Sequence, residues 1–305
     1  MQEWLPGYLQ EMYKMKEIVV ISGKGGTGKT TVTSSLAFLI ENNAIIADCD
    51  VDAPDMHIIL EPEIIEQNEF YSGFHAEINE KMCISCGKCK DICRFDAIDY
   101  KQEVYKINNA ECEGCGYCSQ ICPVEAVKMH ESHTGQLFYS QTRFGNNFVH
   151  ARLNIAAENS GKLVANVRNR AKEEAEKQNK SYVLIDGPPG IGCPVIASIT
   201  GVNYIVLVTE PSMSALHDLA RVVQLIGKFS IPAGCIINKA GMNVQMEDKI
   251  NTFIKEKNIP LLGKVPFDKE IDIAQSKRKT IAEWNATFKN EFRIILNNIR
   301  NLLDK

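Results

Sequence analysis

A glycine-rich loop near the start of the chain has residue types and spacing that suit phosphate chemistry. Residues 23–30 read GKGGTGKT, which fits the pattern G-x-x-x-x-G-K-[ST]. Glycines let backbone N–H groups approach phosphate oxygens, and a helix N-terminus adds a favourable dipole. We expect Lys29 to pair with the terminal phosphates and the Thr30 hydroxyl to bind Mg²⁺. A chance glycine turn is the alternative, and the flanking strand and helix patterns argue against it.

The cysteines are the second set of residues whose types and spacing could do chemistry. Eight of the eleven lie in two runs with the spacing C-x₂-C-x₂-C-x₃-C. In bacterial ferredoxins the fourth cysteine of each such run binds the other cluster. We therefore predict one 4Fe–4S cluster on Cys83, Cys86, Cys89 and Cys122, and a second on Cys112, Cys115, Cys118 and Cys93. Zinc is the alternative, but zinc sites usually use two separated cysteine pairs, and here each run is complete.

The elements that position these residues follow an alternating pattern. Apolar, β-branched runs at 17–22, 44–48, 182–186, 204–209, 234–238 and 261–265 predict buried strands. Helical patterns lie at about 30–41, 160–178, 214–228, 245–258 and 285–303. Strands that alternate with helices predict an α/β fold with a mostly parallel sheet covered on both faces.

One stretch interrupts this alternation. Residues 72–131 are rich in cysteine and in turn-forming residues, and they lie between two predicted strands. We predict an inserted ferredoxin-type domain at 72–131 within a discontinuous P-loop domain of residues 15–71 and 132–305. Residues 1–14 are then an N-terminal extension, because Met15 would itself be a natural start. The connection over residues 132–159 has no clear pattern.

Composition excludes several classes of protein. The net charge of −4 argues against a nucleic-acid binder, which needs a basic surface. No apolar run reaches the length of about 18 residues that a membrane-spanning helix requires. The first residues lack the basic and apolar regions of a signal peptide, and the cysteine spacing favours metal over disulfides. We expect a cytoplasmic protein without a membrane partner.

A second lysine in the loop, Lys24, points to a family. GKGGTGKT with this early lysine resembles the deviant Walker A loop of the MinD/ParA superfamily of P-loop ATPases, which includes the nitrogenase iron protein and Mrp-type carriers. DCDVDAPD at 48–55 is similar to the first switch of that family, and DGPPG at 186–190 is similar to its second switch. The resemblance implies an ATPase that uses ATP, ADP and Mg²⁺, and a homodimer that forms with ATP.

The resemblance also implies roles for single residues. Lys24 would reach the nucleotide of the partner subunit, Asp50 would orient the attacking water, and Asp52 would lie near the Mg²⁺. Asp186 would hold a metal-bound water, Gly190 would sense the γ-phosphate, and Asn238 would read the adenine edge. The predicted nucleotide-binding residues of the loop are Gly23, Lys24, Gly25, Gly26, Thr27, Gly28, Lys29, Thr30 and Thr31.

The remaining cysteines and the C-terminal helix allow two interpretations each. Cys193 follows Asp186 by seven residues, where the nitrogenase iron protein has a cluster ligand, but a buried structural thiol is the favoured interpretation. Cys49 and Cys235 are predicted to be buried. The apolar stripe of the last helix is expected to pack on the sheet rather than on a membrane, with Lys289, Arg293 and Arg300 in solvent.

Three functions compete on this sequence, because a fold does not determine a function. The first is ATP-dependent electron delivery through two 4Fe–4S clusters to a protein partner that the sequence does not identify. The second is assembly or carriage of an iron–sulfur or metal cofactor. The third is a MinD-like spatial-positioning ATPase with redox sensing. We place electron delivery first, because four cysteines per cluster favour retention over transfer.

Overall fold

The computed structural model describes residues 15–154 and 160–304. Within this part the chain divides into two compact units. The large unit falls within Met1–Asn68, Leu137–Arg152 and Ser160–Lys305, and the small unit within Glu69–Gln136 and Leu153–Asn159. The predicted insert limits, residues 72 and 131, lie inside the long strands β3 (Glu63–Ile78) and β6 (Val127–Gln141), and the sequence analysis missed both strands.

A nine-stranded sheet organises the large unit, in the order β11-β10-β9-β1-β8-β2-β7-β6-β3. The strands not yet given bounds are β1 (Lys16–Ser22), β2 (Ala44–Asp48), β7 (Asn147–Leu153), β8 (Tyr182–Pro189), β9 (Tyr204–Thr209), β10 (Ala233–Ala240) and β11 (Leu261–Pro266). The pairs from β11 through to β7 are all parallel. The predicted parallel sheet is confirmed.

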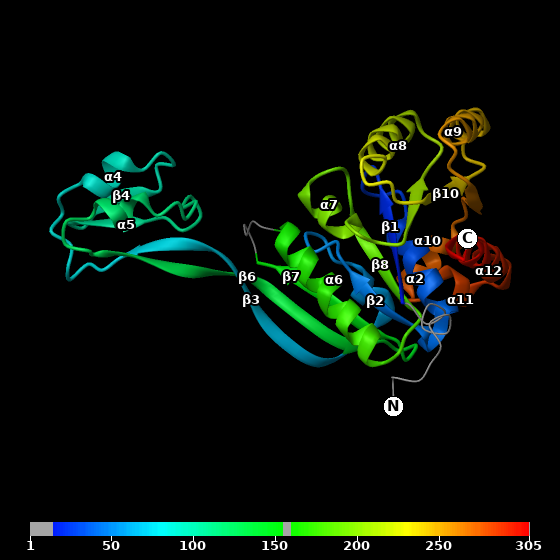
Figure 1. Ribbon diagram of the computed structural model, residues 1–305, viewed down its shortest axis with the longest axis horizontal. Helices are drawn as coiled ribbons and strands as arrows, with labels where there is room; N and C mark the ends of the chain where they lie inside the picture. Colours follow the sequence, from blue (N-terminus) through cyan, green and yellow to red (C-terminus); the bar gives the residue numbers. More distant parts are fainter. Residues whose placement is uncertain (1–14, 155–159, 305) are drawn as a thin grey trace, which may run out of the picture. The chain divides into compact units, whose positions relative to one another are not determined.

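The helices fall on both faces of this sheet (Figure 1). They are α2 (Lys29–Ile40), α3 (Met56–Leu60), α6 (Ser160–Lys177), α7 (Cys193–Ile199), α8 (Met213–Ile226), α9 (Val244–Glu256), α10 (Glu270–Ser276), α11 (Ile281–Trp284) and α12 (Ala286–Leu303), with a 3₁₀ turn η1 (Glu41–Asn43) after α2. All five predicted helices are present. No helix in the described ranges is both long and apolar enough to cross a membrane.

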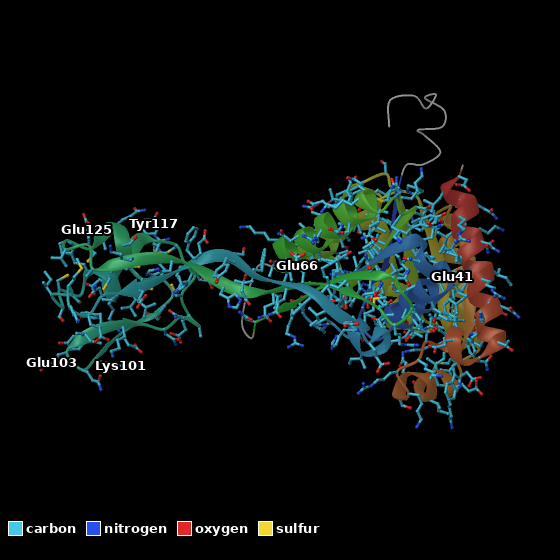
Figure 2. All side chains as sticks on the ribbon, turned by 90° about the horizontal axis from the view of Figure 1, so that it is seen from below. Glu41, Glu66, Lys101, Glu103, Tyr117 and Glu125 are labelled. Atoms are coloured by element: carbon cyan, nitrogen blue, oxygen red, sulfur yellow. The ribbon has the colours of Figure 1, made fainter. Side chains whose placement is uncertain are left out.

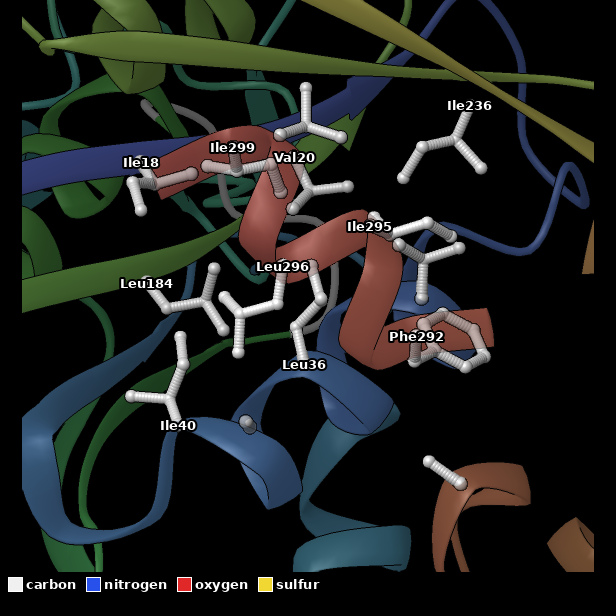
Figure 3. Close-up of a cluster of buried hydrophobic side chains, with 14 of the residues drawn as sticks. Ile18, Val20, Leu36, Ile40, Leu184, Ile236, Phe292, Ile295, Leu296 and Ile299 are labelled. Atoms are coloured by element: carbon white, nitrogen blue, oxygen red, sulfur yellow. The ribbon is translucent and has the colours of Figure 1, made fainter. Parts of the chain in front are cut away.

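The main core lies between the sheet and the helices α2 and α12 (Figure 3). Ile18 and Val20 of β1 face this core, whereas the alternate residues Val19 and Ile21 are equally buried on the other face. Phe292 and Ile295 of α12 are fully buried in the same cluster. Packing of this helix on the large unit is therefore confirmed, although Trp284 at the start of the predicted stripe is 40% exposed.

The small unit has little regular structure. Between β3 and β6 it contains α4 (Lys88–Ile92), the hairpin of β4 (Ile98–Lys101) and β5 (Val104–Ile107), and α5 (Tyr117–Ile121). Its buried cluster consists of Ala76, Ile78, Ile98 and Val127 with the two cysteines Cys89 and Cys118. Cys83, Cys93, Cys112 and Cys122 pack against that cluster. An apolar core this small by itself stabilises a domain poorly.

Candidate functional site

The glycine-rich loop joins the end of β1 to the first residue of α2, as the motif requires. Gly28, just before α2, has a positive φ of 89°. A Cβ at this position would lie 2.1 Å from the Asn238 side-chain nitrogen, so only glycine fits. That same nitrogen donates a hydrogen bond of 2.8 Å to the Thr27 carbonyl. Asn238 thus holds the loop in place, and its buried side-chain oxygen has no protein partner among the described residues.

Asp186, which lies within β8, anchors the start of α2. The Thr30 hydroxyl donates to one carboxylate oxygen at 2.7 Å, and the Thr33 hydroxyl donates to the other at 2.8 Å. Burial raises the pKa of Asp186, and the Lys29 charge with the two hydroxyl donors partly offsets this effect. The carboxylate therefore lies within reach of the hydroxyl that is predicted to bind Mg²⁺.

Lys29 lies among carboxylates. Its ammonium nitrogen is 3.3 Å from Asp50 Oδ2, and the lysine side chain is only 7% exposed. Burial alone would lower the pKa of Lys29, but the charges of Asp186 and Asp50 outweigh it, and the pKa is raised. Lys29 is therefore a fixed cation at neutral pH, as phosphate binding requires.

Asp48 is a buried acid for which the sequence analysis gave no role. It ends β2, beside Asp186 in the register of the sheet. One of its carboxylate oxygens accepts a 3.0 Å bond from the Asp50 backbone N–H, and the other is buried with no partner in the described chain. Burial, followed by the charge of Asp186, raises the pKa of Asp48 well above its usual value. The charge of Asp186 therefore opposes ionisation of Asp48.

Lys24 does not point freely into solvent. Its ammonium nitrogen lies 2.6 Å from Glu210 Oε1 and 3.0 Å from the Ser214 hydroxyl. The second Glu210 oxygen pairs with Lys239 at 2.6 Å, and Lys239 also donates to the Gly26 carbonyl at 2.9 Å. Burial opposes ionisation of Glu210, but the two lysines outweigh it and lower its pKa. In a single chain, Glu210 therefore holds Lys24 beside its own loop.

These residues surround an open cleft of about 740 Å³ in the large unit. The predicted residues that line it are Gly25, Gly26, Gly28, Lys29, Thr30, Thr31, Asp50, Asp52 and Asn238. The predicted residues that are not part of this lining are Gly23, Lys24, Thr27, Asp186 and Gly190. Gln275 also lines the cleft and donates to the Thr31 hydroxyl at 2.8 Å, but no sequence motif marks it. The volume falls in the range of small-molecule sites, about 300–1,000 Å³.

A model of the CobQ/CobB/MinD/ParA nucleotide binding domain matches residues 18–281. This chain belongs to the CobQ/CobB/MinD/ParA family. The match spans β1 to α11, so it includes the whole cleft. The family resemblance that the sequence analysis predicted is confirmed at this level.

Two relatives and one solved structure agree with this membership. An uncharacterised protein of Methanocaldococcus jannaschii is 36% identical over 258 residues, which cover 84% of this chain and 86% of the relative. The septum site-determining protein MinD of Synechocystis is 25% identical over 272 residues, covering 85% and 79%. MinD of Pyrococcus horikoshii, solved with Mg-ADP, aligns with a TM-score of 0.56 at 18% identity, covering 95% and 97%. Two of these three proteins are MinD proteins.

The small unit of this MinD/ParA-family chain repeats one backbone design. Gly87 before α4 and Gly116 before α5 have φ values of 80° and 78°. The residues that end the two helices, Cys93 and Cys122, have φ and ψ of −72° and 113° and of −70° and 114°. The two cysteine runs therefore form two copies of the same turn and helix. Figure 2 shows yellow sulfur atoms near the labelled Glu125 and Tyr117.

The eight cysteines line two small cavities, with four cysteines at each, and both runs contribute to each cavity. Cys83, Cys86, Cys89 and Cys122 line one cavity, and Cys93, Cys112, Cys115 and Cys118 line the other. The backbone N–H of Ala126 donates to the Cys122 sulfur at 3.2 Å. Four thiolates around one cavity are the donor set of a 4Fe–4S cluster. Within the described ranges, no three Cys, His, Asp or Glu side chains are grouped so as to hold a single metal ion.

The other three cysteines divide between core and surface. Cys49 and Cys235 are fully buried, as predicted. Cys193 is exposed at the first position of α7, so the favoured interpretation of a buried thiol was wrong. The reason is local: Gly192 and Pro194 begin a helix that turns its first residue outward.

Proposed function

We propose that this chain hydrolyses Mg-ATP as a switch of MinD type and forms a homodimer when ATP is bound. The observation that carries the proposal is the arrangement of Lys29, Thr30, Asp50 and Asp186 at one cleft. Lys29 and Thr30 begin α2, Asp50 follows β2 and Asp186 lies within β8, so only the folded α/β sheet brings them together. The deviant lysine of the same loop, Lys24, supports dimer formation as part of the cycle.

The chain's own residues have distinct tasks in this reaction. Lys29 and the backbone N–H groups of the loop bind phosphate oxygens, and the positive end of α2 adds to their attraction. Thr30 would hold Mg²⁺, which when bound neutralises charge on the phosphates. Asp50 is then released from its ion pair with Lys29 and can accept a hydrogen bond from the attacking water. Burial raises the pKa of Asp50, which makes it a better proton acceptor.

Two lysine variants test this proposal. Lys29→Ala is expected to lower the affinity for Mg-ATP at least tenfold, because a buried cation at the phosphates is lost. Lys24→Ala should keep nucleotide affinity but lose hydrolysis and dimer formation with ATP. Lys249→Ala, which changes an exposed lysine of α9, is the matched control. Hydrolysis by protein that stays monomeric in light scattering at every ATP concentration would contradict the dimer.

Two 4Fe–4S clusters in the small unit are the second part of the proposal. The two cavities with four cysteines each support it, as do the two cysteines in the buried cluster of this unit and the four that pack against it. The clusters would add one-electron chemistry to the chain. They would also stabilise a unit whose apolar core is small, in the way that structural metals stabilise small domains.

Metal analysis of protein purified without oxygen tests the clusters. We expect about eight irons and eight acid-labile sulfides per chain. Cys93→Ala should disturb the cluster bound mainly by the second run, because ligation is crossed, and Cys193→Ala should leave both electron paramagnetic resonance signals unchanged. Zinc without sulfide would refute the clusters and leave the ATPase proposal intact.

Electron delivery to a partner is the second candidate function. It is favoured by the complete set of four cysteines at each cavity, which suits a retained cluster rather than cargo. Dye-mediated potentiometry in the nucleotide-free, ADP and ATP-analogue states would test it. Potentials that do not change with nucleotide, together with equal nucleotide affinity before and after reduction, would exclude coupling between the two activities.

A further inference from the structure

A second cleft in the large unit lies outside the nucleotide site. Its volume is about 400 Å³, and it shares no lining residue with the larger cleft. Its walls come from the end of α2, the turn between β6 and β7, and one side of α12. The lining residues are Phe38, Leu39, Glu41, Phe144, Lys289, Arg293, Leu296, Asn297 and Arg300.

Three cations of α12 face this cleft. Lys289, Arg293 and Arg300 are separated by four and seven residues, which places them on one side of the helix. None of the three forms an ion pair with any residue that the structure describes. By contrast, the nearby Arg143 pairs with Glu283 at 2.5 Å. Like charges one helical turn apart repel one another, so Lys289 and Arg293 destabilise α12.

The floor of the cleft is aromatic. The rings of Phe38 and Phe144 have centroids 5.1 Å apart and are tilted by 58°. The Lys289 ammonium lies 5.1 Å over the Phe38 ring, and the Arg143 guanidinium lies 4.2 Å over the Phe144 ring. Each ring therefore has a cation over one face and is partly buried against the main core.

Charge and shape together indicate the ligand class. The lining has three cations and the single carboxylate of Glu41, so an anion is attracted. A guanidinium group can donate two parallel hydrogen bonds to the oxygens of one carboxylate, sulfonate or phosphate group. The phenyl rings suit a planar or aliphatic part of the same ligand. We propose that this cleft binds a small organic anion with an apolar part on Phe38 and Phe144 and its acidic group between Lys289 and Arg293. The net charge of −4 of the whole chain argues against a long polyanion.

The fluorescent aromatic sulfonate 8-anilinonaphthalene-1-sulfonate is a suitable probe. Titrations in saturating Mg-ADP keep the nucleotide cleft filled. The unchanged protein should bind the probe, and citrate should compete with it. The double variant Lys289→Gln with Arg293→Gln should weaken binding at least tenfold, because both charges at the acidic group are removed. A matched double variant on α9, Lys249→Gln with Lys255→Gln, should bind as the unchanged protein does.

A measurement of stability separates binding from a structural role. Because the two cations repel each other, the α12 double variant should unfold at the same urea concentration as the unchanged protein or at a higher one. Equal probe binding by the two double variants would overturn the proposal. So would a variant that loses probe binding only because it unfolds earlier. Binding of duplex DNA that depends on Arg293 and is not displaced by citrate would replace the small anion by a polyanion.

Discussion

Replacing Thr33 by valine removes one hydroxyl donor from the centre of the nucleotide site and preserves the shape of the side chain. The Thr33 hydroxyl lies 2.8 Å from Asp186 Oδ1 and 2.9 Å from the Lys29 carbonyl oxygen. Both Thr33 and Asp186 are fully buried. After the change, Thr30 remains as the hydroxyl donor to this carboxylate.

The structure sets the size of the expected effect. A hydrogen bond to a charged group contributes about 1.5–3 kcal/mol, and a buried carboxylate oxygen left without a donor loses this in full. We expect Thr33→Val to lower the free energy of unfolding by about 2 kcal/mol. Thr252→Val is the matched control, because its hydroxyl makes the same bond of 2.9 Å to the carbonyl four residues earlier. Thr252 is exposed and has no carboxylate partner, so its change should stay within about 0.5 kcal/mol.

The deficit should depend on pH in a known direction. Burial raises the pKa of Asp186 in the folded protein, and loss of a donor raises it further. The folded state then binds more protons than the unfolded state between the unfolded pKa of about 3.9 and the folded pKa, so stability falls as pH rises through that window. The loss is greater for Thr33→Val, whose folded pKa is higher, so its deficit should be larger at about pH 8 than at about pH 5. Urea titrations of both variants at these two pH values measure the deficit. A deficit equal to that of Thr252→Val, or the same at both pH values, would refute the reasoning.

Three further changes have defined outcomes. Glu210→Gln removes the carboxylate that holds Lys24, so the dimer should form at an ATP concentration about two- to fivefold lower; an unchanged or higher requirement in light scattering would contradict this. Phe292→Ala empties a fully buried site between α12 and the sheet and should cost about 3–5 kcal/mol in urea unfolding; a cost below about 1 kcal/mol would show that the helix contributes little. Burial lowers the pKa of His150 to about 3, so the folded state binds fewer protons than the unfolded state as pH falls from about 6.5. Stability should therefore decline over that range, and His150→Phe should flatten the decline; equal slopes would exclude this histidine as the cause.

Local sequence was sufficient for the parts of the protein that depend on neighbouring residues. The phosphate loop is one continuous segment between a strand and a helix, so its motif and flanking patterns predict both its place and its geometry. The two cysteine runs are equally local, and their repeat in sequence reappears as a repeat in backbone angles at Gly87 and Gly116. Six of the seven parallel strands were predicted, because strands buried on both faces are continuously apolar, whereas β7 was missed.

Long-range packing decided what the sequence did not reveal. β3 and β6 contain many polar residues, so they lack the apolar signal of a buried strand, and they become strands by pairing with each other in the sheet. The exposure of Cys193 is an exception, because it depends locally on how α7 begins.

The nucleotide site shows the same division. Lys29, Thr30 and Asp50 were found from sequence because they lie within motifs. Glu210, which comes from the end of β9, reaches Lys24 only because β9 and β1 are neighbours in the sheet. The pKa of Asp48 also depends on the fold, because burial and the charge of Asp186 raise it. Sequence therefore identified the groups that we propose to bind phosphate. The fold decided which other groups hold them in place, because contacts between distant segments have no local signature.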